Sequence, residues 1–391
     1  VRAAPSHCKP APPMFRWPEW PSGKVEAILL PVSALLWEDE MTEPLIADAR
    51  EMREFLAALF AAAGLAPTDA ETVADAILEA DLSGRGSHGV QLADLYLERL
   101  CNGTMSTASN PQIISENGGS VVLDAAEMEG HLSAQRAIEI AVAKARDFGV
   151  AAVAMRGGFH FGVLGRYVRI AAEQGCAAIA MCNTKPLMAA PGGAERLLGT
   201  NPLAVAFPVE GETPVVFDMA TTAGAMGTIR QYLAAGEAIP ENWATDDNGK
   251  ATTDPAEALA GLLLPAAGAK GFGLAFVIDM LSGALSGGGW GPTMGELRSD
   301  KPYNGSSLFI TLDIKSFRAL DAFMFEARQG VERIRNSKKA EGVLRLYTPG
   351  ERSAEALAGN NGTIRVMPAT ALALRTRAEI LNVPIPQILK A

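Results

Sequence analysis

At 391 residues, the chain is long enough for more than one domain and for a large buried core. Its 48% hydrophobic and 20% charged residues are typical of an ordinary globular protein, which excludes the disordered and fibrous classes. The net charge of −10 argues against non-specific binding of nucleic acid, because such binding needs a basic face.

The cysteines and histidines predict neither a disulfide framework nor a metal site. The four cysteines contain no CxxC pair, which indicates free thiols in a reducing compartment, and we expect a cytoplasmic protein. No two of the four histidines have the spacing of a zinc motif. The longest apolar run, 25–37, contains Glu26 and Pro31 and is shorter than the roughly 20 residues of a membrane span. We therefore expect no metal and no membrane partner.

Composition changes sharply at Met41. The tract before it is rich in Pro and Trp and has no periodicity. We expect residues 1–40 to be a disordered or misassigned leader and Met41 to be the native start.

The first third after Met41 is predicted to be helical. Apolar residues at helical spacing predict a helix over 46–63, which ends at Gly64. Thr68 and Glu71 have the spacing of a capping box and predict the start of a second helix. A third amphipathic stretch ends at Asn102-Gly103, and Ser87-His88 interrupts this helical layer.

Strands and helices then alternate, which predicts βαβ units in a mixed or parallel sheet. The helix over 270–285 is nearly all apolar and is expected to be buried on most of its faces. No GxGxxG follows a strand, so the usual dinucleotide fingerprint is missing. The strands are predicted at 120–124, 150–155, 176–182, 203–207, 215–217 and 307–314, and the helices at 133–147, up to 175, 222–235, 270–285, 317–335 and from about 369.

Two histidines could carry chemistry. His88 stands between Gly86 and Gly89, which leave its imidazole approachable, and a pKa of about 6.5 suits acid–base work. The alternative is that Ser87 caps a helix and His88 is a solvated residue of its first turn. His160 lies in a Gly-rich turn between a strand and a helix, where it could bond a ligand or simply pack between two phenylalanines.

Polar residues at other turns could join them. Thr200 and Asn201 lie in a turn before a strand, and Asp218 ends a strand, as a helix cap or a hydroxyl binder. Lys270 opens a helix, where a cation opposes the macrodipole, so either an anionic partner or snorkelling to the surface would explain it. Together these groups fit proton-coupled chemistry on a small anionic substrate, but they do not specify hydride transfer.

The motifs in their order resemble the type-2 malate/L-lactate dehydrogenase family, which includes ureidoglycolate and sulfolactate dehydrogenases and piperideine-2-carboxylate reductases. The resemblance covers Met41 to the C-terminus. It rests on DLSGRGSHGVQLADLYLERLCNG, FHFGVLGRYVRIAAEQG, APGGAERLLGTNPLAVAFP, FDMATTAGAMGTI, IPENWATDDNGKATTDPAEAL, LLPAAGAKGFGLAFVIDMLSGALSG and YTPGER.

The resemblance implies an α/β fold of the family's own, a mixed-sheet NAD(P)-binding fold like that of L-sulfolactate dehydrogenase, rather than a Rossmann domain. It implies an N-terminal helical part (41–118), a central cofactor-binding domain (119–310) and a C-terminal part (311–391) that packs back on the first. It also implies a homodimer that uses NAD or NADP to interconvert a 2-oxo acid and an L-2-hydroxy acid. A cyclic imino-acid reductase and a non-catalytic ligand-binding relative remain as alternatives.

Residue roles also follow from the resemblance. His88 is the implied acid/base, oriented by Ser87, although His160 is the proton acceptor in some members. Thr200 and Asn201 are the implied substrate contacts. The implied cofactor contacts are His160, Phe161, Gly162, Val163, Leu164, Thr184, Asp218, Met219, Ala220, Ala269, Lys270, Gly350, Glu351 and Arg352.

Three positions depart from the family's commoner pattern. Many members have an arginine five residues after the motif serine, where this chain has Leu92. Because a bidentate arginine is a strong carboxylate clamp, its loss predicts altered specificity, and Arg85 is the nearby candidate to replace it. Gly86 and Thr228 stand where the family commonly has Asp and Lys.

Overall fold

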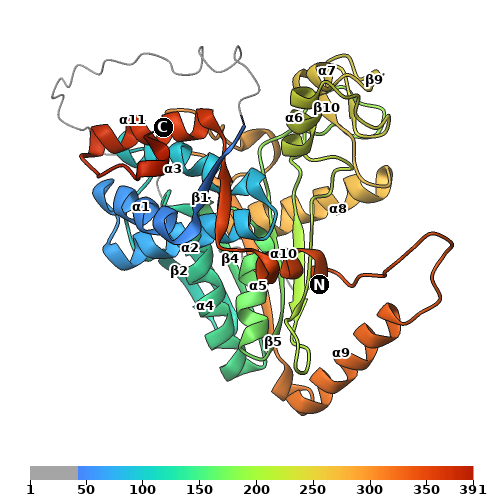
Figure 1. Ribbon diagram of the computed structural model, residues 1–391. Helices are drawn as coiled ribbons and strands as arrows, with labels where there is room; N and C mark the ends of the chain where they lie inside the picture. The colour runs from blue at the N-terminus through green and yellow to red at the C-terminus, as the bar shows by residue number, and fades with distance from the viewer. Residues whose placement is uncertain (1–42, 391) are drawn as a thin grey trace, which may run out of the picture. The chain divides into compact units, whose positions relative to one another are not determined.

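A seven-stranded mixed sheet forms the centre of the fold (Figure 1), with the strand order β2-β3-β4-β11-β5-β6-β7. Strands β3 and β4 are parallel, and the other five neighbouring pairs are antiparallel. The predicted mixed sheet is confirmed. The strands are β2 (Gln112–Asn117), β3 (Ser120–Asp124), β4 (Val150–Gly158), β5 (Cys176–Cys182), β6 (Leu203–Phe207), β7 (Val215–Met219) and β11 (Gly305–Asp313).

This computed structural model describes residues 43–390, which belong to one compact unit. The predicted leader lies outside the described residues, and the predicted division of the rest into three parts stays a prediction. Of the helices in the described range, none combines the length and the apolar character needed to cross a membrane.

The two faces of the sheet are covered differently. Helices α4 (Gly130–Phe148) and α5 (Leu164–Glu173) pack side by side on one face and bury the main core (Figure 1). On the opposite face, Ile278 packs against Met181 and Leu308. Since successive side chains of a strand point to opposite faces, this contact places α8 (Ala269–Asp279) on the side away from α4 and α5.

The predicted helical layer is present before β2. It contains α1 (Ala49–Ala62), α2 (Pro67–Leu82) and α3 (Ala93–Cys101), and α11 (Pro368–Leu381) packs against α1 and α3. Strand β1 (Leu45–Asp48) pairs antiparallel with β12 (Thr363–Val366), so the two ends of the described chain meet in a small sheet.

A small second core lies beside the main sheet. It is built on α6 (Met226–Ala235), α7 (Pro255–Ala260) and the short strands β8 (Ala244–Thr245), β9 (Ala251–Thr252) and β10 (Leu262–Leu263), at the top right of Figure 1. Beyond β11, α9 (Leu320–Arg335) packs Val331 against Val209 and Val215, and α10 (Glu351–Gly359) follows.

Three local predictions are wrong. The capping box at Thr68 does not form, because α2 begins at Pro67, whose fixed φ suits the first helical position, and Ala66 is its N-cap. No strand is predicted over 112–117, but this segment forms the exposed edge strand β2. The helix over 270–285 is not buried on most faces, because Phe276 and Val277 are each 49% exposed and Leu285 is 57% exposed.

Candidate functional site

Three helix N-termini meet around residues 218–222, which form the end of β7 and the turn after it. The amide of Gly165 in α5 donates to Asp218 Oδ2 at 2.9 Å. A Cβ added to Gly271 in α8 would lie 2.9 Å from the carbonyl of Thr221. Helix α6 starts four residues after this segment, and the N-cap residues of α6 and α8 make no side-chain hydrogen bond to their helices. Among the described residues, the first N–H groups of α6 and α8 are therefore donors for an anion at this point, whereas the Gly165 amide of α5 already donates to Asp218.

Ser87 and His88 lie beside the start of α6. A Cβ added to Gly227 would lie 2.8 Å from the Cβ of Ser87, and Ser87 Oγ is 2.9 Å from Nδ1 of His88. Burial lowers the pKa of His88 below its usual 6.5, and the nearby Asp218 partly opposes that shift. A neutral imidazole held at Nδ1 is suited to accept a proton at Nε2.

Asp81 holds this turn in place. Its Oδ2 accepts a hydrogen bond from the amide of Val90 at 2.7 Å, and burial raises its pKa to about 7. A Cβ added to Gly89 would lie 2.2 Å from the same oxygen, so only glycine lets the carboxyl approach the backbone here.

His160 stacks on His88, with ring centroids 5.7 Å apart and 25° between the planes. Its Nδ1 lies 2.7 Å from the hydroxyl of Tyr96 and 3.4 Å from the amide nitrogen of Gly162. Because an amide can only donate, Nδ1 is assigned as the acceptor and Nε2 carries the proton. Burial holds the pKa of His160 well below 6.5, so the ring is neutral.

Arg85 connects the histidine turn to the end of β7. Its Nη1 donates to Asp218 Oδ2 at 2.9 Å, and its Nε lies 3.5 Å from Ser353 Oγ on α10. The side chain of Asp218 is 7% exposed. A predicted substrate contact and a predicted cofactor contact are therefore joined by one ion pair.

The turn at Thr200 is held by its neighbours. The carbonyl of Thr200 accepts hydrogen bonds from the amide and the hydroxyl of Thr221, both at 2.9 Å. Asn201 is fully buried, and its amide group joins Thr184 to the carbonyl of Ala275 on α8. Thr200 thus lies next to the segment at which the helices meet.

The remaining predicted cofactor residues differ in their surroundings. Phe161 and Leu164 are buried in the main core, whereas Lys270 is exposed at the start of α8. Gly350 approaches the carbonyl of Val216, and Glu351 accepts hydrogen bonds from Thr348. Val163, Thr184, Met219 and Ala220 are half-buried, Ala269 is exposed and Arg352 lies over the ring of Tyr347.

Three parts of this site are not among the predicted site residues. Tyr96 lies in the third amphipathic stretch, and Thr221 follows the predicted cofactor contact Ala220. The third part is the buried pair Glu129–His131 behind Tyr96. A polar group inside an apolar helical pattern, such as the Tyr96 hydroxyl, is the signal that could have found the first of these.

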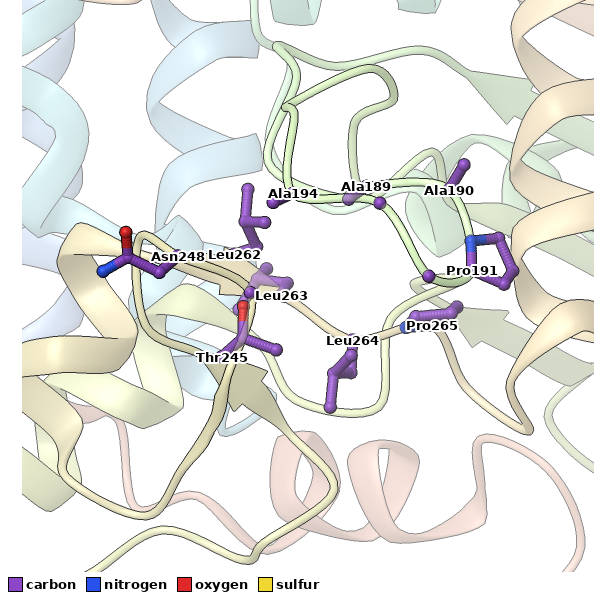
Figure 2. A pocket seen from close by; sticks show the side chains of 13 residues that line it. Ala189, Ala190, Pro191, Ala194, Thr245, Asn248, Leu262, Leu263, Leu264 and Pro265 are labelled. Carbon is purple, nitrogen blue, oxygen red and sulfur yellow. The ribbon is translucent and has the colours of Figure 1, made fainter.

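A separate cavity of about 190 Å³ lies between the loop 189–194 and the strands of the second core (Figure 2). Its side chains are small or apolar apart from Thr245 and Asn248, and none of its lining residues is titratable. The cavity thus lacks groups for proton transfer, and the histidine site is the better candidate. Among residues 43–390, no cluster of three His, Cys, Asp or Glu side chains could hold a metal ion.

The donor set fits a dinucleotide. Groups of this kind bind phosphate oxygens: the first N–H groups of α6 and α8, the exposed Lys270, and the buried hydroxyl of Thr222, which has no hydrogen-bond partner in the described part of the chain. The glycines at 165, 227 and 271 bring the helix backbones close to Asp218, Ser87 and Thr221.

Comparison with known proteins identifies one family. The family model for malate/L-lactate dehydrogenases matches residues 47–374. A malate dehydrogenase of Pyrococcus abyssi is 36% identical over 310 residues, which are 77% of this chain and 85% of that protein.

Solved structures of related enzymes have the same fold. The sulfolactate dehydrogenase of Methanocaldococcus jannaschii superposes with a TM-score of 0.83 and 32% identity, over 87% of this chain and 98% of that one. A Δ1-piperideine-2-carboxylate reductase of Pseudomonas syringae pvar. tomato superposes with a TM-score of 0.74 and 28% identity, over 86% and 100%.

Proposed function

We infer the reaction from one premise: the chain belongs to the malate/L-lactate dehydrogenase family. The family and the fold class predicted from the motifs are confirmed. The protein is an NAD(P)-dependent dehydrogenase of 2-hydroxy acids. We propose that it interconverts a 2-oxo acid and the corresponding L-2-hydroxy acid, with His88 as the acid/base.

The contact between Ser87 and His88 carries this proposal. Ser87 Oγ bonds Nδ1 of His88 and leaves Nε2 as the nitrogen that exchanges a proton with the substrate oxygen. In the oxidation direction the neutral ring accepts the hydroxyl proton, and in the reduction direction the protonated ring returns it. When bound, NAD(P) supplies the hydride chemistry at the substrate carbon, and the protein supplies position and charge.

We assign the cofactor to the place where the three helices meet. There Asp218 and Met219 end β7, Ala220 follows it, and Ala269 and Lys270 open α8. The turn from His160 to Leu164 leads into α5, whose Gly165 amide bonds Asp218. Thr200, held by Thr221, lies at the same place and is proposed to contact the substrate.

An absorbance assay tests the proposed reaction. NADH and NADPH are each offered with a panel of 2-oxo acids and with cyclic imines, with and without a chelator. Reduced nicotinamide absorbs at about 340 nm. Loss of this absorbance with a 2-oxo acid, unaffected by chelator, supports the proposal. Turnover of cyclic imines alone would instead support an imino-acid reductase, which Leu92 and the similarity to the Pseudomonas reductase favour as the second candidate. Cofactor binding without any turnover would indicate a non-catalytic relative.

Arg85 is proposed to replace the missing carboxylate clamp. We expect Arg85→Ala to raise KM for the 2-oxo acid by about tenfold or more, because a charge-assisted contact is lost, while KM for the cofactor changes by less than about threefold. Steady-state kinetics with each substrate varied in turn measures both. Arg50→Ala, at an exposed arginine on α1, is the matched control. If KM for the cofactor rises and KM for the 2-oxo acid does not, Arg85 supports cofactor binding through Asp218 and is not the carboxylate clamp.

A homodimer is proposed from the exposed apolar face of α8 and of the helical segment that continues it to Leu285. Phe276, Val277, Leu281 and Leu285 recur at helical spacing and are 38–57% exposed, which is typical of a surface that a partner covers. We expect Phe276→Asp to convert a dimer to a monomer in analytical ultracentrifugation, and Ile380→Asp, at an exposed apolar residue of α11, to leave it unchanged. A wild-type monomer at micromolar concentration would contradict the proposal. The cytoplasmic location stays a prediction.

A further inference from the structure

A buried acid–base pair lies behind the two histidines of the site. Glu129 and His131 flank Gly130 at the start of α4 and are 0% and 1% exposed. Glu129 Oε1 lies 2.7 Å from Nδ1 of His131, and Oε2 accepts a hydrogen bond from the amide of Leu132 at 3.0 Å. The carboxylate therefore fixes the ring and caps the helix at once. The reaction proposed above uses neither residue.

The other nitrogen of His131 faces the turn that follows His160. Among the described residues, Nε2 of His131 has no hydrogen-bond partner. A Cβ added to Gly162 would lie 2.8 Å from it, and Gly162 has a φ of +73°. The ring thus fills the space that a side chain at position 162 would need, and the turn rests on it.

Tyr96 links His131 to His160 by a second route. The rings of Tyr96 and His131 meet edge to face, with centroids 5.0 Å apart and 81° between the planes. The Tyr96 hydroxyl lies 2.7 Å from Nδ1 of His160. Burial raises the pKa of Tyr96 well above 10, so its hydroxyl stays protonated and available as a donor.

Both routes from His131 end on the same atom. The Tyr96 hydroxyl and the amide of Gly162 both lie near Nδ1 of His160. The Tyr96 ring contacts His131, and the Cβ position of Gly162 faces Nε2 of His131. We propose that the Glu129–His131 pair is a positioning pair, which holds Tyr96 and the Gly162 turn so that His160 keeps its proton on Nε2 and its ring parallel to His88. His131 acts through these groups and does not touch the substrate.

The expected change in kcat rests on the proposed function, but the expected tautomer of His160 does not. His131→Leu removes the ring nitrogens, whereas His131→Gln keeps an amide N–H that can donate to Glu129. Ser133→Ala, at another buried residue of the same helix turn, is the matched control, since the Ser133 hydroxyl donates to the carbonyl of Gly130 and the substitution leaves both ring nitrogens of His131 in place. If His131→Leu fails to fold because Glu129 is left buried and unpaired, the double variant Glu129→Gln/His131→Leu removes that charge.

Two measurements test the pair. Nitrogen NMR of ¹⁵N-histidine protein is expected to show the Nε2–H tautomer of His160 in the wild type, in His131→Gln and in Ser133→Ala, and its loss in His131→Leu. In kinetics, His131→Leu is expected to lower kcat by about 10- to 100-fold, as loss of a supporting hydrogen-bonded group does. His131→Gln should stay within about threefold of the wild type, and KM for the cofactor should change little.

The outcomes separate the two proposals. A wild-type tautomer and unchanged kcat in His131→Leu would overturn the positioning role. Equal loss of kcat in Ser133→Ala would also overturn it, because general loosening of the helix would then suffice. A wild-type enzyme that turns over none of the substrates would overturn the proposed function alone, and the NMR comparison would still decide the role of the pair.

Discussion

Replacing His88 with alanine is expected to lower kcat by about 10²- to 10⁴-fold, which is the usual contribution of a positioned acid/base. The affinity for NAD(P) should stay within about threefold, because the helix N-termini and Asp218 are untouched. Stopped-flow or steady-state kinetics gives kcat, and fluorescence titration gives Kd for the cofactor. Ser87→Ala keeps the imidazole but removes its Oγ contact, so we expect a smaller loss.

The matched control is Gln91→Ala. Gln91 is exposed and bonds the carbonyl of Gly86 in the same short segment, so its replacement disturbs the turn without removing the imidazole. Equal losses of kcat and cofactor affinity in His88→Ala would indicate a structural role. If His160→Gln abolishes turnover and His88→Ala does not, the acid/base is His160 and not His88.

Replacing Arg99 with leucine is expected to lower the free energy of unfolding by about 3–5 kcal/mol, because three carbonyls lose the hydrogen bonds of a buried guanidinium. Arg99 is 2% exposed, and its guanidinium donates to the carbonyls of Glu296, Leu297 and Lys301 at 2.7–3.0 Å. It also lies 5.1 Å from the centroid of the Phe159 ring, next to His160. Urea unfolding followed by circular dichroism measures the change.

Arg298→Ala is the control for this loop. Arg298 pairs with Glu98 between the same two segments but is 61% exposed, so its loss should cost less than about 1 kcal/mol. Arg99→Lys should recover part of the stability, since an ammonium keeps the charge but cannot span three carbonyls as the fork does. An Arg99→Leu variant as stable as the wild type would show that the loop can repack.

Short apolar strands were the easiest elements to predict. The strands at 120–124, 176–182 and 203–207 have the predicted bounds, because each contains a short apolar run between residues that interrupt it. Ser120 and Asp124 bound the first run, Gly175 and Asn183 the second, and Pro202 and Pro208 the third. The edge strand β2 could not be predicted, because all six of its residues are exposed and it has no buried apolar face that would give an alternating pattern. The exposure of one side of α8 could not be predicted, because an apolar helix sequence is equally typical of a protein core and of a surface between subunits.

In the site, motifs identified residues but not their pairing. Ser87 and His88 adjoin each other in sequence, so their contact could be anticipated. The ion pair of Arg85 with Asp218 joins residues 133 positions apart and depends on how α2 and β7 are brought together. The same holds for Tyr96 and His160, which are 64 positions apart, since no local pattern marks a tyrosine hydroxyl that serves a distant imidazole.

The position of β11 has a consequence for biosynthesis. Strand β11 lies between β4 and β5 and pairs with both, although it follows β5 by more than a hundred residues. A nascent chain that has emerged from the ribosome only as far as β10 therefore has two central strands with unpaired edges, which are prone to aggregate. The sheet that carries the site can close only after translation has passed residue 313, so productive folding of this enzyme waits for nearly the whole polypeptide.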